Sequence, residues 1–175
     1  MRIACVLGEG FEDQEFRVPY DELKGAGHEV TIIGAEKGAK VSGKNGKESV
    51  KTDASIEDSR PESFDALFIP GGYSPDHLRA DPRFVEFTRG FANKPIMAIC
   101  HGPQMLLSAD LVKGRTLTAW KTVQVDLRYA GANVVDKEVC VDKNLVTSRQ
   151  PDDIPAFVRE SLRVLTNGAT AHSSR

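Results

Sequence analysis

The stretch Met97-Ala98-Ile99-Cys100-His101-Gly102-Pro103-Gln104 decides the fold, because it joins a short apolar run to the start of a helix. Ile96–Ile99 is typical of a buried strand, and Pro103–Ala109 has the pattern of a helix with proline at its first position. The glycine between them allows a tight turn. Such a junction exposes the side chain of Cys100 at the end of the strand, as in the nucleophile elbow of hydrolases.

The same alternation of apolar runs and helical segments extends in both directions from this junction. Further strands are predicted at residues 2–7, 28–33, 66–69, 117–119, 134–135, 139–141 and 145–147. Further helices are predicted at residues 12–25, 82–92, 122–129 and from about 151 to 165, and Asn45-Gly46 within residues 41–50 predicts a tight hairpin. This order predicts one α/β domain over residues 1–167, with a mostly parallel sheet covered by helices on both faces. The small, polar residues 168–175 predict a flexible tail.

Length and charge exclude several classes of protein. The 175 residues contain 23 Lys and Arg against 25 Asp and Glu, a net charge of −2, and 40% of them are hydrophobic. A chain of this balance lacks the basic footprint that nucleic acids and anionic membranes require. No apolar stretch approaches the roughly 20 residues of a membrane span. The N-terminus reaches Gly8-Glu9-Gly10 too soon for a signal peptide, so we expect a cytoplasmic protein.

The three cysteines differ in their predicted surroundings. Cys5, Cys100 and Cys140 have no C-x-x-C spacing, which argues against a zinc site or a disulfide framework. Cys5 and Cys140 lie within predicted strands, where a free cysteine usually serves as a small core residue. Cys100 instead stands at a strand end before a helix, where the helix dipole is expected to lower the pKa of its thiol. Cys100 is therefore the candidate nucleophile, and no metal is implied.

Polar groups from two other loops are expected beside Cys100, because the carboxyl ends of parallel strands meet at one edge of the sheet. His101 is a candidate base. In the acidic loop Glu9–Glu15, Glu12 is the carboxyl predicted to contact the thiol. Pro70-Gly71-Gly72 brings backbone amides close to a bound group, as an oxyanion hole requires, and Asp76 is a candidate at the edge of the site.

Four motifs together resemble the PfpI family of intracellular protease-like and deglycase-like proteins, within the class I glutamine amidotransferase-like superfamily. They are Phe11-Glu12-Asp13, Pro70-Gly71-Gly72, Ala98–Gln104 and the S-R-x-P-x-D pattern at Ser148–Asp153, in the family's order and spacing. The resemblance extends to about Leu165. It implies a flavodoxin-like three-layer sandwich, a homodimer or hexamer, and no cofactor.

The same resemblance implies roles for individual residues. Cys100 would be the nucleophile, Glu12 would hydrogen-bond its sulfur, and the amides of Gly72 and His101 would face the substrate's carbonyl oxygen, at a turn that contains Gly102. Some members place an acid of a neighbouring subunit against the histidine after the nucleophile, and Asp76 occupies that position here. Glutaminases of the superfamily carry a histidine after the last strand, where this chain has none.

The favoured function is a cysteine-dependent hydrolase or lyase of the stress response. Its expected substrates are adducts that methylglyoxal or glyoxal forms with amines and thiols, or the free dicarbonyls. One alternative is an intracellular peptidase that uses Cys100, His101 and Asp76 of a partner chain. A second alternative is a redox sensor or chaperone-like stress protein, because an exposed, activated thiol also suits reversible oxidation. All three hypotheses use the same thiol.

Overall fold

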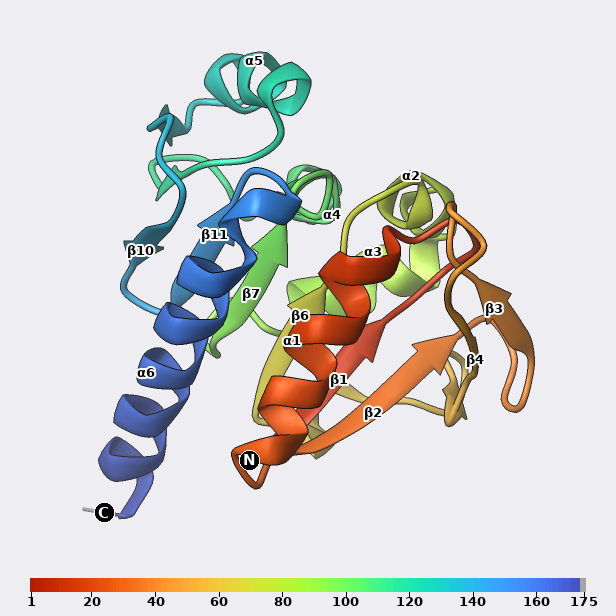
Figure 1. Ribbon diagram of the computed structural model, residues 1–175. Coiled ribbons are helices and arrows are strands. Elements are labelled where there is room, and N and C mark those ends of the chain that lie inside the picture. The colour runs from red at the N-terminus through yellow and green to blue at the C-terminus, as the bar shows by residue number, and fades with distance from the viewer. Residues whose placement is uncertain (174–175) are drawn as a thin grey trace.

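A seven-stranded sheet forms the centre of the computed structural model, which describes residues 1–173, with side chains as far as residue 168 (Figure 1). The strands lie in the order β10-β11-β7-β6-β1-β2-β5, and every neighbouring pair is parallel except β10 and β11. Their bounds are β1 (Arg2–Val6), β2 (Glu29–Gly34), β5 (Ala54–Ser55), β6 (Ala66–Ile69), β7 (Ile96–Ile99), β10 (Cys140–Asp142) and β11 (Leu145–Ser148). The predicted, mostly parallel sheet is confirmed.

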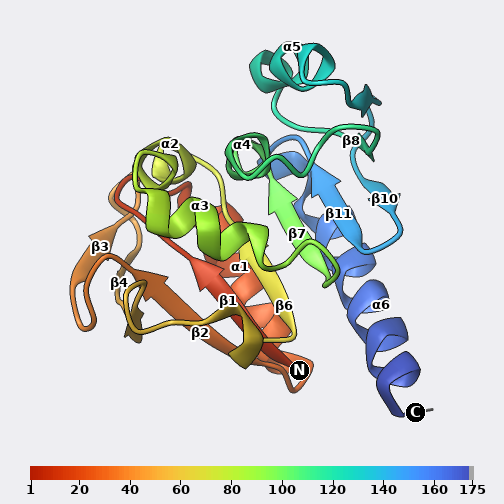
Figure 2. The ribbon, with the colours of Figure 1, turned by 180° about the vertical axis from the view of Figure 1, so that it is seen from behind.

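Helices cover both faces of the sheet. One face carries α1 (Asp13–Gly25) and α6 (Ile154–Ser173), and the other carries α2 (Ser74–Arg79), α3 (Pro82–Arg89) and α4 (Pro103–Ser108) (Figures 1 and 2). Successive residues of a strand point to opposite faces, so Ala4 packs in the cluster under α3 and α4, whereas Ile3 packs with α1 and α6. Burial on both faces explains why the strands have continuous apolar sequences. Cys5 is buried within β1 as predicted.

A third group of elements lies beyond the β7 and β11 strand ends. It contains α5 (Lys121–Tyr129) and a small two-stranded sheet of β8 (Thr116–Leu117) and β9 (Asn133–Val134). Figure 2 shows α5 standing above α4 and the ends of these strands. The chain enters α5 through Trp120, whose backbone amide donates to the carbonyl of Cys100 at 2.9 Å. This group therefore contributes one wall beside the predicted nucleophile.

The predicted hairpin is present as β3 (Lys40–Ser42) and β4 (Ser49–Lys51), although residues 43–48 form a longer loop than the tight turn that was expected. Asp13 fixes the hairpin to the start of α1. The Asp13 carboxylate accepts hydrogen bonds of 2.8–2.9 Å from the backbone amides of Asn45, Lys47 and Glu48. A Cβ atom at Gly43 would lie 2.3 Å from Asp13 Oδ1, so only glycine permits this approach. The tip of the hairpin is thereby held beside the first turn of α1.

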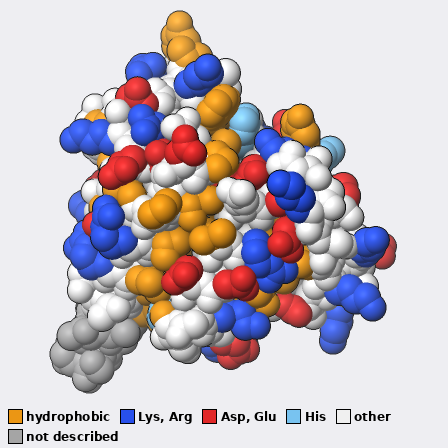
Figure 3. Space-filling view, viewed as in Figure 1, with side chains coloured by type: hydrophobic (Ala, Val, Ile, Leu, Met, Phe, Trp, Pro, Cys, Tyr) orange, Lys and Arg blue, Asp and Glu red, His pale blue; other side chains and the backbone are white. Residues whose placement is uncertain are grey.

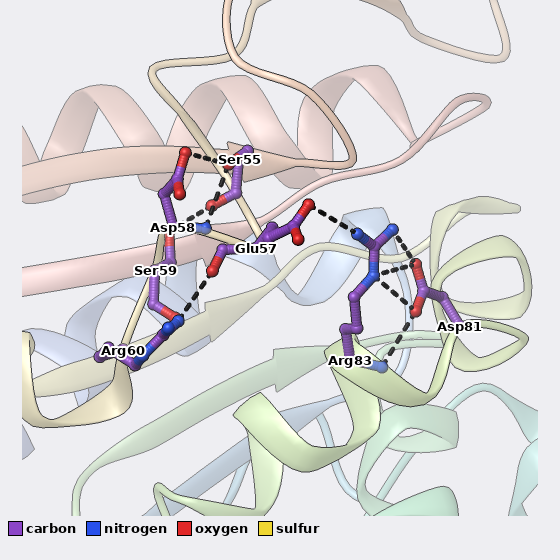
Figure 4. Close-up of polar contacts among 7 residues, drawn as sticks. All are labelled: Ser55, Glu57, Asp58, Ser59, Arg60, Asp81 and Arg83. Atoms are coloured by element: carbon purple, nitrogen blue, oxygen red, sulfur yellow. Dashed lines mark hydrogen bonds and ion pairs between the residues drawn. The ribbon is translucent and has the colours of Figure 1, made fainter.

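Asp81 fixes the beginning of α3. Its carboxylate caps the helix through the amide of Arg83 at 2.9 Å and pairs with the Arg83 guanidinium at 2.8 Å (Figure 4). The same guanidinium reaches Glu57 at 3.7 Å, and Arg60 donates to the Glu57 carbonyl at 2.8 Å. These contacts attach α3 to the loop that follows β5.

Three segments differ from the sequence-based expectation. Residues 74–79 form α2, although only a loop was predicted there, and β5 is too short to give a periodic pattern. Helix α6 continues to Ser173 through part of the predicted tail 168–175, and residues 174–175 lie outside the described part. The helix has packing partners there, because a Cβ atom at Gly168 would contact Met1 at 3.2 Å. Among residues 1–173, no helix is long and apolar enough to cross a membrane.

Candidate active site

Cys100 lies at the predicted junction between β7 and α4, in an uncommon backbone conformation. Its φ of 63° is in the left-handed region, which costs a residue other than glycine about 1–3 kcal/mol. Two hydrogen bonds hold it there: the Cys100 amide donates to Ser148 at 2.9 Å, and the Cys100 carbonyl accepts from Trp120 at 2.9 Å. The surrounding structure therefore imposes this conformation, and the sulfur is directed to the carboxyl edge of the sheet.

The turn after Cys100 requires Gly102. A Cβ atom at this position would lie 2.6 Å from the carbonyl oxygen of Ile69 and 3.0 Å from that of Ile99. The Gly102 amide donates to the Ile99 carbonyl at 2.8 Å, which closes the turn. The structure thus confirms the glycine-dependent junction between strand and helix.

The carboxyl beside the thiol belongs to Glu15, and the expectation that Glu12 contacts the sulfur is corrected. Glu12 is the N-cap of α1, because its Oε2 accepts from the Glu15 amide at 2.8 Å. Its Oε1 accepts from the Asn45 side chain at 3.3 Å. Glu15 stands three residues later in the first helical turn, where its side chain is directed inward and is fully buried.

Glu15 and Cys100 meet at Gly71. A Cβ atom on that glycine would lie 2.3 Å from Glu15 Oε1 and 2.8 Å from Cys100 Cβ, so any larger residue would separate the carboxyl from the thiol. Neither Glu15 oxygen makes a hydrogen bond of good geometry among the described residues. Burial, followed by the charge of Glu12, raises the pKa of Glu15 to about 8. Glu15 therefore holds its proton at neutral pH and can donate it to the sulfur.

The thiol pKa does not follow the helix-dipole expectation. Burial, followed by the charge of Glu15 and the hydrogen bond to it, raises the pKa of the Cys100 thiol, whereas the amides of His101 and Gly72 lower it. Only 7% of Cys100 is exposed, so desolvation outweighs the amides at the short helix α4. The expectation of a lowered pKa is wrong for this environment. Because Glu15 is mostly protonated below pH 8, its opposing charge is largely absent at neutral pH.

His101 lies within reach of the sulfur. Its Nδ1 is 3.3 Å from Cys100 Sγ, and its ring stacks on Trp120 at a centroid distance of 6.3 Å. Burial, followed by the charge of Lys44, lowers the pKa of His101, and Asp76 opposes this effect. The imidazole is therefore neutral at pH 7 and can accept a proton. Asp76 is exposed on α2, and within residues 1–168 no hydrogen bond joins it to His101.

Gly72 brings a second backbone amide to the thiol. Its φ is +80°, and a Cβ atom there would lie 2.3 Å from the amide nitrogen of Glu12. Hydrogen bonds from Glu12 to the Gly71 carbonyl at 3.1 Å and from Tyr73 to the Gly10 carbonyl at 2.8 Å tie the two loops together. The backbone amides of Gly72 and His101 both stabilise negative charge on the Cys100 sulfur. Two converging amides are the arrangement that an oxyanion hole needs.

The sequence reasoning missed two residues of this site. Glu15 could have been predicted from the helix start. If Glu12 is the N-cap, its side chain binds the helix, and Glu15, three positions later, is the next glutamate of the first turn. Lys44 acts on Glu15 and His101 from the hairpin, a long-range placement that no local pattern encodes. Within the described residues no group of three or more His, Cys, Asp or Glu side chains is placed to hold a metal ion.

A cavity of about 540 Å³ lies elsewhere, between α3 and the loop of residues 56–62. Two of its three arginines are paired with carboxylates, since Arg83 contacts Asp81 and Glu57, and Arg89 contacts Glu86 (Figure 4 shows the Arg83 contacts). The third, Arg60, donates to the backbone carbonyls of Glu57 and Ser59. No cysteine or histidine lines it. The groups with nucleophilic and acid–base chemistry therefore gather at Cys100 and not in this cavity.

Known proteins resemble this chain over most of its length. Residues 1–164 match the DJ-1/PfpI family. The chain is 56% identical over 167 residues to "Protein/nucleic acid deglycase 2" of Escherichia coli (strain K12), covering 94% of this chain and 97% of that protein. It is also 56% identical to "General stress protein 18" of Bacillus subtilis (strain 168), with the same coverage.

A solved structure shows the same fold. It is a two-domain protein from Anabaena variabilis ATCC 29413 with DJ-1/ThiJ/PfpI-like and ferritin-like domains. The two structures superpose with a TM-score of 0.91 at 36% sequence identity, over 97% of this chain and 49% of the larger protein. The match to half of that chain corresponds to one of its two domains.

Proposed function

Because the chain belongs to the DJ-1/PfpI family, we propose that it is a cysteine-dependent deglycase with Cys100 as its nucleophile. Its substrates would be the adducts that methylglyoxal or glyoxal forms with amines and thiols. The observation that carries this proposal is the Cys100 thiol beside the buried, protonated carboxyl of Glu15. The name of the Escherichia coli relative supports the same chemistry.

The first step uses Cys100 and Glu15. Sulfur attacks the carbon that bears both the hydroxyl and the amine of the adduct, so that a C–S bond forms as the C–N bond breaks. The thiol proton passes to Nδ1 of His101, which lies 3.3 Å from the sulfur. The leaving amine takes the proton of Glu15, whose pKa of about 8 suits a general acid at neutral pH. The product is a hemithioacetal on Cys100.

The second step moves a proton within the bound fragment. The Glu15 carboxylate removes the proton from the carbon attached to sulfur, and the electron pair moves toward the neighbouring carbonyl oxygen. The amides of Gly72 and His101 stabilise the negative oxygen. The proton returns to the neighbouring carbon, and the hydroxyl on the sulfur-bearing carbon gives its proton to the negative oxygen as it becomes the thioester carbonyl, so the product is a 2-hydroxyacyl thioester. Water then hydrolyses this thioester to a 2-hydroxy acid and releases the thiol, so one water is consumed and no external oxidant or reductant is needed.

A peptidase remains the alternative, because the site also contains a histidine beside the thiol. That reaction would require an acid to orient His101. In the single chain Asp76 acts on His101 only through its charge, and it is exposed on α2. An intersubunit arrangement would therefore have to supply the contact. Peptide cleavage that disappears on dilution to monomer would support this alternative over the deglycase.

Self-association into a homodimer or hexamer and a cytoplasmic location belong to the same proposal. Hydrophobic side chains gather on the surface between α1 and α6 (Figure 3). Val18 on α1 is 40% exposed, and Tyr20, Val158 and Leu162 are only partly buried at the edge of the core. Sedimentation of wild type and Val18→Glu would test whether this face is an interface.

Release of product from a preformed adduct tests the function. N-acetyllysine and N-acetylcysteine are first treated with methylglyoxal and freed of excess reagent. We expect the wild-type protein to release the amine or thiol together with lactate, measured by NMR. Cys100→Ser should abolish release, whereas Cys5→Ser, in the buried strand β1, should retain it. Equal release by wild type and Cys100→Ser would contradict the proposal.

A further inference from the structure

The β3–β4 hairpin places a lysine beside the thiol. The backbone amide of Lys44 donates to the Phe11 carbonyl at 2.8 Å, in the loop that leads into α1. Its side-chain nitrogen lies 5.8 Å from the centre of the Tyr73 ring. Tyr73 directly follows Gly72, whose backbone amide stabilises negative charge on the Cys100 sulfur. The Tyr73 side chain is 64% exposed. Lys44 and Tyr73 therefore lie together beside the loop that carries Gly72.

The charge of Lys44 has no carboxylate partner. Within residues 1–168 its nitrogen contacts the face of Tyr73, and no carboxylate oxygen lies at ion-pair distance from it. A cation above an aromatic face keeps its charge available to a further group. The anchoring of the hairpin by Asp13 fixes the position of this cation, because three backbone amides of the hairpin bind one carboxylate.

The positive charge of Lys44 acts on Glu15 and His101, the two acid–base groups beside Cys100. Burial is the main cause of the shifts at Glu15 and His101, but Lys44 also lowers the pKa of each. Lys47, in the same hairpin loop, is not among the main causes of either shift. Of the two lysines in the loop between β3 and β4, Lys44 is therefore the one that acts on the groups beside Cys100.

The negative groups of the site are distributed unevenly. Glu15 holds its proton at neutral pH, and the charge of the Glu12 carboxylate, which the Glu15 amide and Asn45 bind, acts on Glu15 and not on His101. Asp76 on α2 acts on His101 in the opposite direction to Lys44. On the His101 side of the sulfur, an anionic group is thus attracted toward Lys44 on the hairpin and repelled from Asp76 on α2. This asymmetry would orient the molecule.

We propose that Lys44, together with Tyr73, binds an anionic group of the substrate, and that the preferred substrates carry a carboxylate or a phosphate close to the glycated atom. The identity of these substrates as glycation adducts rests on the proposed function. The presence of the anion-binding position does not, because any molecule that reaches the sulfur would experience the same charge. Lys44 is a specificity residue in this proposal.

Alkylation of Cys100 tests the anion-binding position without any turnover. Iodoacetate and iodoacetamide have nearly the same size and differ by one negative charge. We measure the ratio of their rate constants at Cys100 by mass spectrometry of the labelled peptide, in wild type, Lys44→Gln and Lys47→Gln. The ratio corrects for any change in the reactivity of the thiol itself. The Lys47→Gln variant changes the net charge equally on the same hairpin.

We expect Lys44→Gln to lower the iodoacetate to iodoacetamide ratio about threefold to tenfold, as loss of one nearby exposed charge predicts. Lys44→Arg and Lys47→Gln should leave it within a factor of two of wild type, and high salt should reduce the effect of Lys44→Gln. An unchanged ratio in Lys44→Gln, or an equal fall in Lys47→Gln, would overturn the proposal.

Adducts of stated charge test the substrate class. Methylglyoxal adducts of glycine, of O-phosphoethanolamine and of glycinamide present a carboxylate close to the glycated nitrogen, a phosphate close to it, and no charge. Lys44→Gln should raise KM for the first two adducts at nearly constant kcat and leave the third unchanged. A rise in KM for all three would assign Lys44 a general role and overturn the proposed specificity. Inactivity of wild type on every adduct would instead refute the proposed function, while the alkylation ratio still decides on Lys44.

Discussion

The carboxyl of Glu15 and the thiol of Cys100 approach each other across a glycine, Gly71, at which no Cβ atom fits. Burial raises the pKa of both groups. The charge of Glu15 and the hydrogen bond to it raise the pKa of Cys100 further, whereas the hydrogen bond with Cys100 lowers the pKa of Glu15. Such a pair shares one proton more readily than it holds two charges. The pH dependence of the site should therefore depend on Glu15.

Glu15→Gln should make Cys100 more reactive at high pH. In wild type, Glu15 ionises as the pH rises through about 8, and its charge opposes formation of the thiolate. Glutamine remains neutral and still offers a hydrogen-bond donor. The ratio of the iodoacetamide rate constants, variant over wild type, should be near one at pH 6.5 and increase through pH 8. A ratio that stays constant from pH 6 to pH 10 would contradict the charge assignment.

The same carboxyl should affect stability with a definite sign. The folded-state pKa of about 8 lies above the ordinary value near 4.3, so the native protein binds a proton that the unfolded chain releases. The stabilising effect is complete below about pH 4 and is lost as the pH rises toward 8. Relative to Glu15→Gln, the wild-type free energy of unfolding should therefore fall by as much as about 1.4 kcal/mol per pH unit in this interval. Urea denaturation at pH 5, 6, 7 and 8 measures the difference.

Much of this architecture could be predicted from the sequence, because its strands are short apolar runs that end at glycine, cysteine or proline. The strand Ile96–Ile99 and the hairpin around Asn45-Gly46 are local patterns, and both were confirmed. The choice of Glu12 over Glu15 failed because the N-cap determines which residue of the first turn is directed inward. That position is fixed by the contact of Glu12 with Asn45, far away in the sequence. Lys44 was missed for the same reason.

Asp13→Ala should destabilise the protein and detach the hairpin from α1. Although burial opposes its ionisation, hydrogen bonds from the amides of Asn45, Glu48 and Lys47 lower the pKa of Asp13. Loss of these charge-assisted bonds should cost about 2–4 kcal/mol of unfolding free energy. The control is Asp21→Ala, because Asp21 is an exposed ion-pair partner of Arg17. This substitution should lower the free energy of unfolding by less than about 1 kcal/mol. Equal destabilisation by both substitutions would show that the Asp13 contacts contribute little.

Gly102→Ala should destabilise the turn that presents Cys100. The added Cβ atom would lie 2.6 Å from the Ile69 carbonyl oxygen, a backbone atom that cannot move without disturbing the sheet. We expect a loss of about 2 kcal/mol or more in unfolding free energy, together with slower labelling of Cys100. Gly25→Ala is the matched control, because nothing lies within 4 Å of its Cβ position at the end of α1. That variant should be neutral or more stable by about 0.5–1 kcal/mol.

The fluorescence of Trp120 should report the protonation of His101. Trp120 is the only tryptophan of the chain, and the two rings stack at 6.3 Å. Burial and then the charge of Lys44 lower the pKa of His101, so the imidazolium, which quenches indole emission, should form only below the ordinary histidine value of about 6.5. We expect emission to fall as the pH decreases through this range, and His101→Asn to remove the transition while His77→Asn retains it. Lys44→Gln should move the midpoint upward, since a repelling charge is lost. A midpoint at or above 6.5 in wild type, or one unaffected by His101→Asn, would refute the arrangement of His101 between Trp120 and the thiol.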